Sequence, residues 1–268
     1  MNLIDTHAHL NDIKYKDDLA EVIERAKNTG LKHIILATAC EQDCHDVLPM
    51  AKKHTTEDLK FWCTVGVHPH DASEYNDRID ALLRDWIKKR KENRIVAIGE
   101  IGLDYFYDHS PRDIQKQVFC KQLDIAFEMD IPFVIHERDA TADFLSILAE
   151  YVSQKKLRSV PGVCHCFSGS PETAEILLSY GFYLGFDGPL TFKNSRRSPE
   201  VVQITPLNRL LLETDSPYLS PVPHRGTRNE PSYVQFVLNK MAELKGLSED
   251  EMAEITMKNA CDLFEIPR

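Results

Sequence analysis

The sequence Leu3-Ile4-Asp5-Thr6-His7-Ala8-His9 predicts a short strand that runs directly into two histidines. Alternate side chains of an extended chain share one face, so the two imidazoles are expected to point the same way. Neighbouring ring nitrogens are typical of a metal-ligand pair, although a His-x-His pair can also arise by chance among 11 histidines. The interpretation of this pair therefore depends on what the rest of the chain brings beside it.

The composition is that of a globular protein. Its 268 residues are 43% hydrophobic and 28% charged, and no apolar run approaches the about 20 residues of a membrane span. The N-terminus lacks the pattern of a signal peptide, so we expect a cytoplasmic location. Seven cysteines are an odd number, which favours reduced thiols over a disulfide framework. The net charge of −10 excludes a broadly basic, nucleic-acid-coating surface but allows a local basic rim around a site.

Short β-rich apolar runs alternate with longer amphipathic runs without a linker or repeat, so residues 1–268 are expected to form one domain. Strands are expected at 3–5, 33–38, 61–66, 95–99, 132–136, 162–165, 182–186 and 210–213. Helical patterns cover 17–29, 79–91, 113–129, 142–154, 171–180, 231–245 and 248–264. About eight such units in about 250 residues predict an α/β fold, a (β/α)8 TIM barrel. An open doubly wound sheet is the alternative, but no Gly-x-Gly-x-x-Gly motif follows the first strand.

Residues that can bind metal follow most of the expected strands. In a barrel the carboxyl ends of the strands meet at one mouth, so residues far apart in the sequence would share a pocket. A single strand-end histidine is more often a satisfied polar residue, and a single acid more often caps the next helix. Their joint occurrence at matching strand ends predicts a metal centre. The expected ligands are His7, His9, Glu100, His136, His165 and Asp215.

These six ligands exceed the four that one tetrahedral zinc ion accepts, so we expect two divalent metal cations per chain that share a bridging group. Glu100 has two oxygens and is the natural bridge. One site would contain His7, His9 and Asp215, and the other His136 and His165. Histidine-rich ligation favours zinc or manganese over magnesium, which remains the alternative.

Seven motifs extend from the first residues to the region of residue 226. They are Asp5-Thr6-His7-Ala8-His9-Leu10, Gly66-Val67-His68-Pro69, Gly99-Glu100-Ile101-Gly102-Leu103-Asp104-Tyr105, His165-Cys166-Phe167-Ser168-Gly169, Thr191-Phe192-Lys193-Asn194, Glu213-Thr214-Asp215-Ser216-Pro217-Tyr218 and Pro223-His224-Arg225-Gly226. Together they resemble the TatD family of metal-dependent hydrolases and nucleases.

The resemblance implies an amidohydrolase-like barrel, a divalent-metal pair on the ligands above and hydrolysis, typically of DNA. In the wider amidohydrolase-type barrels the bridge is often a modified lysine, whereas this chain has Glu100. Asp187 stands where members of the family more often carry a small residue, so the loop after the seventh strand is expected to differ.

We expect Asp215 to act as the general base toward the attacking water, with Glu100 holding the catalytic cations together. Two residues within the family-like motifs, His68 and Arg225, are the candidates for substrate contact. The loops after the seventh and eighth strands lie side by side in a barrel, commonly as a phosphate site. Their basic residues are Lys193, Arg196, Arg197, Arg225 and Arg228. The alternative for Arg196 and Arg197 is a solvated charged loop.

The first functional hypothesis is a deoxyribonuclease, a 3′–5′ exonuclease whose partner is the single-stranded DNA end that it hydrolyses. The alternative is a hydrolase of an ester or amide bond, such as an aminoacyl-tRNA ester or a cyclic amide, because fold and metals do not choose the electrophile. A non-enzymatic barrel protein is a third hypothesis, and the complete ligand set argues against it. The aromatic residues of the stretch Asp104-Tyr105-Phe106-Tyr107 could stack an unpaired base, or they could be ordinary packing. No membrane association and no obligate protein partner is evident.

Overall fold

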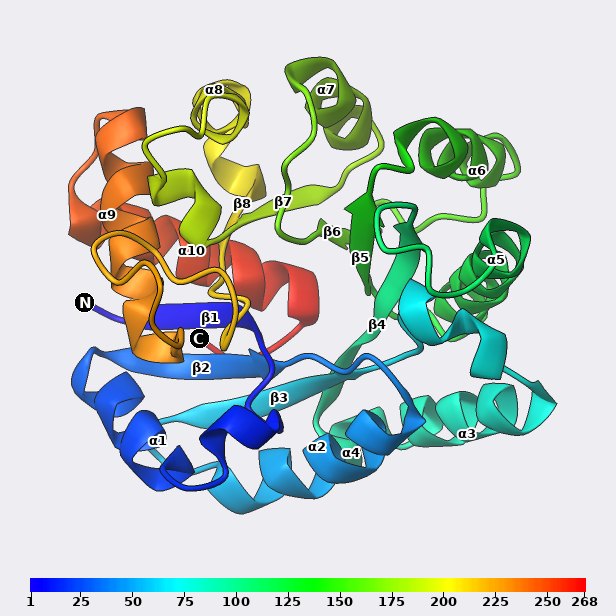
Figure 1. Ribbon diagram of the computed structural model, residues 1–268, viewed down its shortest axis with the longest axis horizontal. Helices are drawn as coiled ribbons and strands as arrows, with labels where there is room; N and C mark the ends of the chain where they lie inside the picture. Colours follow the sequence, from blue (N-terminus) through cyan, green and yellow to red (C-terminus); the bar gives the residue numbers. More distant parts are fainter.

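Eight parallel strands follow one another around the molecule in sequence order in the computed structural model, which describes residues 1–268 (Figure 1). They are β1 (Leu3–Ala8), β2 (Leu31–Leu36), β3 (Lys60–Val65), β4 (Ile95–Asp104), β5 (Phe133–Arg138), β6 (Gly162–Cys164), β7 (Tyr183–Phe186) and β8 (Leu210–Leu212). Each strand pairs in parallel with the next, which confirms the predicted (β/α)8 barrel.

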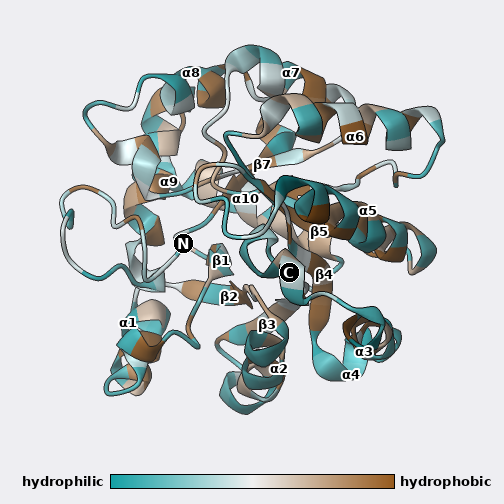
Figure 2. Cartoon of the chain, turned by 45° about the vertical axis from the view of Figure 1, so that its right-hand side comes forward, coloured by the Kyte–Doolittle hydropathy of each residue, from teal (hydrophilic) through white to brown (hydrophobic).

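Most of the helices surround the barrel on the outside (Figure 1). They are α1 (Leu19–Asn28), α2 (Glu41–His54), α3 (Asp77–Lys88), α4 (Arg90–Asn93), α5 (Arg112–Glu128), α6 (Thr141–Ser153), α7 (Pro171–Ser179), α8 (Arg197–Ile204), α9 (Val234–Lys245) and α10 (Glu249–Phe264). Short 3-10 helices are η1 (Ile13–Tyr15), η2 (Pro69–Glu74), η3 (Gly188–Thr191), η4 (Leu207–Arg209) and η5 (Pro231–Tyr233). Hydrophilic and hydrophobic stretches alternate along the outer helices, as expected for elements with one buried face (Figure 2). No helix has the length and apolar character needed to cross a membrane.

The largest differences between the predicted and the observed elements are of three kinds. Strands β1 and β4 are longer than expected, because every residue of both is buried and the pairing continues through the polar positions. Helices α2 and α8 were not predicted, since α2 is polar with Pro49 inside it and α8 begins within a run of basic residues. The expected helix at 79–91 is divided into α3 and α4.

The hydrophobic core has two parts, one between the barrel and the outer helices and one inside the barrel. The inner part combines strand residues such as Val134 and Val163 with Phe264 of α10. Side chains two positions apart on a strand share a face. The alternation that turns these two valines inward therefore also places His136 and His165 on the inner side, one step nearer the carboxyl ends of the strands.

Between β1 and β8 the regular backbone pairing is reduced to one isolated bridge, Ala8 with Ser216. Polar side chains supply further hydrogen bonds between these two parts of the chain. Thr214 donates to the Asp5 carboxylate through its backbone N–H at 3.0 Å and through its hydroxyl at 2.6 Å. The Thr6 hydroxyl donates to the Leu212 carbonyl at 2.9 Å. Burial raises the pKa of Asp5 to about 8, against the lowering effect of the hydrogen bonds from Thr214. The motif that carries the first two histidines thus also closes the barrel.

His33 of β2 is a buried histidine far from the site that should make folding stability depend on pH. It is 4% exposed, and its Nδ1 accepts a hydrogen bond from Trp62 Nε1 at 3.0 Å. Burial lowers the pKa of His33 from 6.5 to about 4, and the charges of Lys60 and Arg94 act in the same direction. The unfolded state therefore takes up this proton first as the pH falls. The stabilising contribution is complete above pH 6.5 and is lost between about pH 6.5 and pH 4.

We expect the wild-type protein to lose about 3 kcal/mol more unfolding free energy than His33→Gln between neutral pH and about pH 4. Glutamine keeps an acceptor for Trp62 but does not titrate. Urea unfolding of both proteins at the two pH values measures the difference. Equal losses would show that His33 does not contribute to acid sensitivity.

Candidate metal centre

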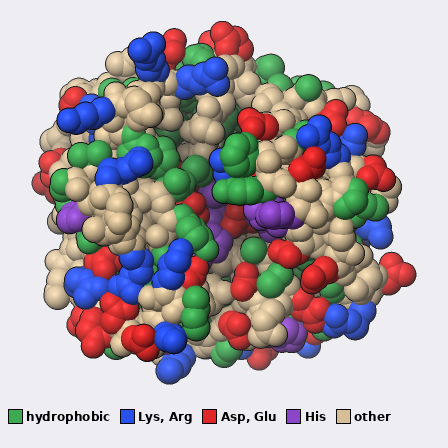
Figure 3. All heavy atoms as spheres, in the orientation of Figure 1, with side chains coloured by type: hydrophobic (Ala, Val, Ile, Leu, Met, Phe, Trp, Pro, Cys, Tyr) green, Lys and Arg blue, Asp and Glu red, His purple; other side chains and the backbone are tan.

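The six predicted metal ligands lie together at the carboxyl ends of the strands. Their side chains are largely buried, from 1% exposed for His7 to 18% for His136. Figure 3 shows histidine and acidic side chains in a hollow near the middle of the molecular face. The barrel therefore brings residues from both halves of the chain into one pocket, as the strand-end pattern predicts.

The first group of candidate ligands gathers around one oxygen of Glu100. Its Oε1 lies 3.1 Å from His7 Nε2 and 3.2 Å from His9 Nε2. Asp215 Oδ1 lies 3.4 Å from His9 Nε2 and 3.7 Å from His7 Nε2. Two imidazoles and two carboxylates thus converge on one small volume.

The second group gathers around the other oxygen of Glu100. Its Oε2 lies 3.2 Å from His165 Nε2 and 3.9 Å from His136 Nδ1. The His165 ring is also stacked on the His7 ring, with centroids 3.9 Å apart, so the two groups are adjacent. His165 and His136 thus face one oxygen of Glu100, and His7 and His9 face the other.

The carboxylates of this cluster ionise despite their burial. Burial opposes ionisation of Glu100, but His7 and His165 outweigh it and hold the pKa of Glu100 well below its usual range. Burial likewise opposes ionisation of Asp215, and its contact with His9 lowers the pKa of that carboxyl. The pKa of His9 is raised to about 10, because Asp215 and Glu100 outweigh the burial of the ring.

The donor set fits divalent cations. Donor atoms held about 2.1 Å from one tetrahedral ion lie about 3.4 Å from one another, which is the spacing within the cluster. Both ring nitrogens of His165 and Nδ1 of His7 are buried without a hydrogen-bond partner. Imidazole nitrogens mixed with carboxylate oxygens suit zinc or manganese better than a cation that prefers only oxygen.

Asp104 at the end of β4 orients His136, a role that the sequence analysis does not assign. Its Oδ2 lies 2.9 Å from Nε2 of His136 and 2.9 Å from Nε2 of His70. When His136 donates from Nε2, its Nδ1 lone pair is left facing Glu100, the arrangement by which carboxylates orient metal-binding histidines. The sequence signal was the spacing, because Asp104 follows Glu100 by four residues in one strand and an even spacing predicts a shared face.

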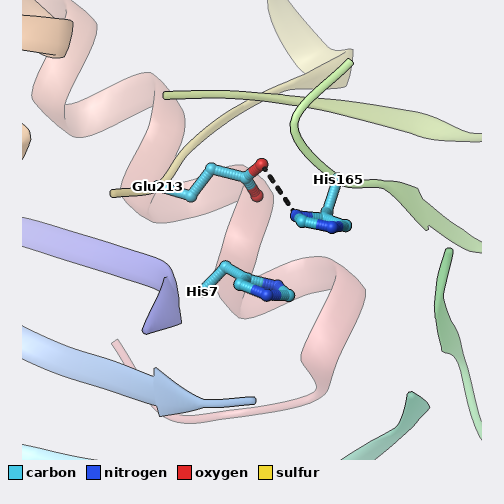
Figure 4. Close-up of side chains that lie close together, drawn as sticks. All are labelled: His7, His165 and Glu213. Carbon is cyan, nitrogen blue, oxygen red and sulfur yellow. Dashed lines mark ion pairs between the residues drawn. The ribbon is translucent and has the colours of Figure 1, made fainter. Parts of the chain in front are cut away.

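Glu213, which follows β8, lies beside His165 (Figure 4). Glu213 Oε1 lies 3.7 Å from His165 Nδ1, and the same carboxylate accepts a hydrogen bond from the Cys166 backbone N–H. A Cβ at Gly185 would lie 2.3 Å from Glu213 Oε2, so only glycine leaves room for this buried acid. Glu213 thus lies beside Nδ1 of the His165 ring, whose Nε2 faces Glu100.

The two predicted substrate contacts lie in different surroundings. His68 is 6% exposed, and its Nε2 lies 3.9 Å from Glu100 Oε2, so it belongs to the interior of the cluster and not to the rim. Arg225 is exposed, and its guanidinium carbon lies 3.6 Å from the centroid of the Phe192 ring. Arg225 makes no hydrogen bond or ion pair with the cluster.

The basic residues of the loops after β7 and β8 fall into two sets, one that is ion-paired and one that is not. Arg228 donates to Asp18 Oδ1 at 2.7 Å and to the Lys14 carbonyl, so its charge is neutralised beside α1 and does not join the expected phosphate site. The cations that stay exposed without an ion pair are Lys193, Arg196, Arg197 and Arg225.

Asp187 after β7 is buried close to the acids of the cluster. It is 3% exposed, and its Oδ2 has no hydrogen-bond partner. Burial, with repulsion from Asp215 and Glu213, raises the pKa of Asp187 well above its usual range and so favours its neutral form. All seven cysteines are free thiols, as predicted.

A parallel barrel whose strand ends bring histidines and carboxylates into one pocket is the architecture of a metal-dependent hydrolase. The sequence model of the family described as TatD related DNase matches residues 4–265. The chain therefore belongs to the TatD family, and it is a metal-dependent hydrolase of that family.

Proteins of known sequence or structure support this assignment over the whole chain. The metal-dependent hydrolase YabD of Bacillus subtilis is 44% identical over 265 residues, which cover 98% of this chain and 99% of that protein. A 3′-5′ ssDNA/RNA exonuclease TatD of a Rahnella species is 34% identical, with 96% of each chain covered. The crystal structure of YJJV, a TatD homologue from Escherichia coli, has a TM-score of 0.89 at 28% identity, with 99% of this chain and 98% of that chain covered.

Proposed function

We propose that the protein hydrolyses phosphodiester bonds at the 3′ ends of single-stranded DNA, with two divalent cations bound at the cluster. The observation that carries this proposal is the division of the donor atoms between the two oxygens of Glu100. Two cations that share a ligand suit in-line displacement at phosphorus, because they can stabilise both the attacking and the leaving oxygen. The relative of the Rahnella species that is named a 3′-5′ ssDNA/RNA exonuclease supports a nucleic-acid substrate.

The proposed ligands are His7, His9 and Asp215 on one side of Glu100, and His136 and His165 on the other. Cations bound there would make a coordinated water more acidic and offset charge on the phosphate oxygens.

Asp215 is the proposed general base. Its carboxylate is ionised, and Oδ1 faces the same space as His7 Nε2 and His9 Nε2. A group in this position can take the proton of a water that enters between the two sides of the cluster. Glu100 is the proposed bridge between the two cations and not the base, because both of its oxygens already face ring nitrogens.

His68 is suited to donate a hydrogen bond to a phosphate oxygen. Its Nδ1 accepts a hydrogen bond from the His70 backbone N–H at 3.1 Å, so the ring hydrogen is on Nε2. Burial, together with the neighbouring His136, holds the pKa of His68 well below its usual range, so the ring is neutral. An Nε2–H group that faces the cluster can donate to a substrate but cannot bind a cation, which supports a substrate contact.

The exposed cations after β7 and β8 suit a polyanionic substrate. Lys193, Arg196, Arg197 and Arg225 are exposed and form no salt bridge. On a body of net charge −10, such a local group attracts a nucleic-acid end without making the whole surface bind it. Arg225 is the proposed substrate contact among them, with its guanidinium held on the face of Phe192.

The test is an assay of the purified protein on a single-stranded oligonucleotide labelled at its 5′ end, in the presence of zinc, manganese or magnesium. We expect progressive shortening from the 3′ end, resolved by gel electrophoresis and end-group analysis. A chelator should abolish hydrolysis, and adding back the metal should restore it, because the proposed activation of water depends on the bound cations.

A panel of substrates provides the control. It contains blunt duplex DNA, an aminoacyl-tRNA, a lactone and a cyclic amide. Hydrolysis of an ester or amide without hydrolysis of any oligonucleotide would contradict the proposed function and favour the alternative electrophile. Shortening from the 5′ end would contradict the proposed direction alone.

A further inference from the structure

The loop between β4 and α5 presents two aromatic rings to solvent beside the cluster. Phe106 is 55% exposed and Tyr107 is 50% exposed, with their ring centroids 4.9 Å apart and perpendicular. The neighbouring Tyr105 is different, because it is partly buried and its hydroxyl donates to Asp143 at 2.7 Å. Packing explains Tyr105, whereas the next two rings keep about half of their surface exposed, with the His109 ring stacked beside Tyr107 at 5.5 Å between centroids.

Arg138 at the end of β5 lies against the same two rings. Its guanidinium carbon is 3.8 Å from the centroid of Phe106 and 4.9 Å from that of Tyr107. The guanidinium is exposed and makes no ion pair and no side-chain hydrogen bond. Phe106, Tyr107 and Arg138 together form what we call the ring platform, which offers aromatic faces and one uncompensated cation.

A continuous path of rings connects the platform to the cluster. The Tyr107 centroid lies 5.3 Å from that of His70, which lies 4.3 Å from that of His68. The His68 ring in turn lies 4.4 Å from that of His136. A nucleotide whose phosphate reached the cluster could therefore place its base, or that of its neighbour, on the platform.

One carboxylate holds both the platform and the cluster in position. Asp104 Oδ1 accepts hydrogen bonds from the backbone N–H groups of Phe106 at 3.0 Å and Tyr107 at 2.9 Å. Its Oδ2 contacts Nε2 of His136 at 2.9 Å. The exposed rings are thus fixed relative to a proposed metal ligand, as a built binding site requires.

We propose that the ring platform binds an unpaired base next to the phosphodiester bond that is hydrolysed, with Arg138 contacting the adjoining phosphate. The proposal rests on the proposed function and identifies the residues that would make the enzyme select single-stranded DNA. Two rings and one cation match the size and charge of a nucleotide, whereas a protein partner would need a wider apolar surface. A base in a duplex is held by its pairing partner and by stacking on its neighbours, so this site favours the unpaired bases of single-stranded ends.

The test compares wild type with Tyr107→Ala on two single-stranded oligonucleotides, one normal and one whose two 3′-terminal nucleotides lack bases. We expect Tyr107→Ala to raise KM for the normal oligonucleotide about 10-fold or more and to leave kcat nearly unchanged. On the abasic oligonucleotide the two proteins should have the same KM. Tyr107→Phe keeps the ring and should behave as wild type, and Phe127→Ala removes an exposed ring at the far end of α5 as a matched control.

A binding measurement provides a readout that does not depend on turnover. A phosphorothioate oligonucleotide with 2-aminopurine at its 3′ end should lose fluorescence on binding wild type, by stacking, and keep it with Tyr107→Ala. Equal effects of Tyr107→Ala on the normal and abasic oligonucleotides would overturn the platform while the nuclease function stands. Failure of wild type to hydrolyse any oligonucleotide would overturn the proposed function and the platform with it.

Discussion

Replacement of Glu100 with glutamine is expected to lower hydrolysis about 1,000-fold and to reduce the bound metal from about two ions per chain to about one. Glutamine keeps one oxygen but replaces the other with an NH₂ group, which cannot bind a cation. Because each oxygen of Glu100 faces a different donor group, only one group should lose its Glu100 oxygen. Metal analysis and steady-state kinetics on the same preparation measure the two effects together.

The matched control is Glu175→Gln, the same change on the exposed face of α7, which should alter neither value. Unfolding curves of both variants separate loss of a ligand from loss of the fold. Full metal content and full activity in Glu100→Gln would remove Glu100 from the proposed bridging position.

Asp215→Asn is expected to lower kcat by about 100- to 10,000-fold, the range that a positioned general base contributes. Asparagine is the sharper substitution than alanine, because Asp215 has a φ of 54° and asparagine tolerates this left-handed conformation. The amide oxygen can still contact a cation, whereas the amide cannot take a proton from water. Kinetics on the oligonucleotide and its binding affinity, measured separately, should show a loss in turnover with little loss in binding.

Asp130→Asn is the control for the backbone, because Asp130 also has a positive φ, 45°, and lies on the surface. Wild-type turnover in Asp215→Asn would exclude Asp215 as the base. Loss of bound metal in parallel with turnover would assign it a ligand role only.

The fold was predictable because alternating strand and helix patterns extend over the chain and only a few architectures accommodate them. The prediction was weakest where polarity and hydrophobic burial conflict. Strand β4 continues through Glu100 to Asp104, because pairing with β5 and the buried cluster compensate polar residues that look like a strand end in the sequence. Helix α8 was not predicted for a similar reason, because the basic residues at its start look like part of a charged loop in the sequence.

The candidate ligands were also predictable, because the rule that strand ends share a mouth converts sequence position into spatial position. The surrounding carboxylates were not. Asp104 and Glu213 lie within the quoted motifs, but only the structure shows that they face His136 and His165. Arg228 shows the reverse error, since a basic residue in the right loop turned out to be paired with Asp18.

The first motif illustrates what each level determines. By itself the sequence from Leu3 to His9 predicts a strand and two histidines on one face, since alternation within an extended chain is local. Only the tertiary structure decides that Asp5 binds Thr214 to close the barrel, and that His7 and His9 share one oxygen of Glu100. Those contacts join residues some 90 to 210 positions apart. Their distances depend on barrel closure and strand register, which the whole chain sets and no local pattern contains.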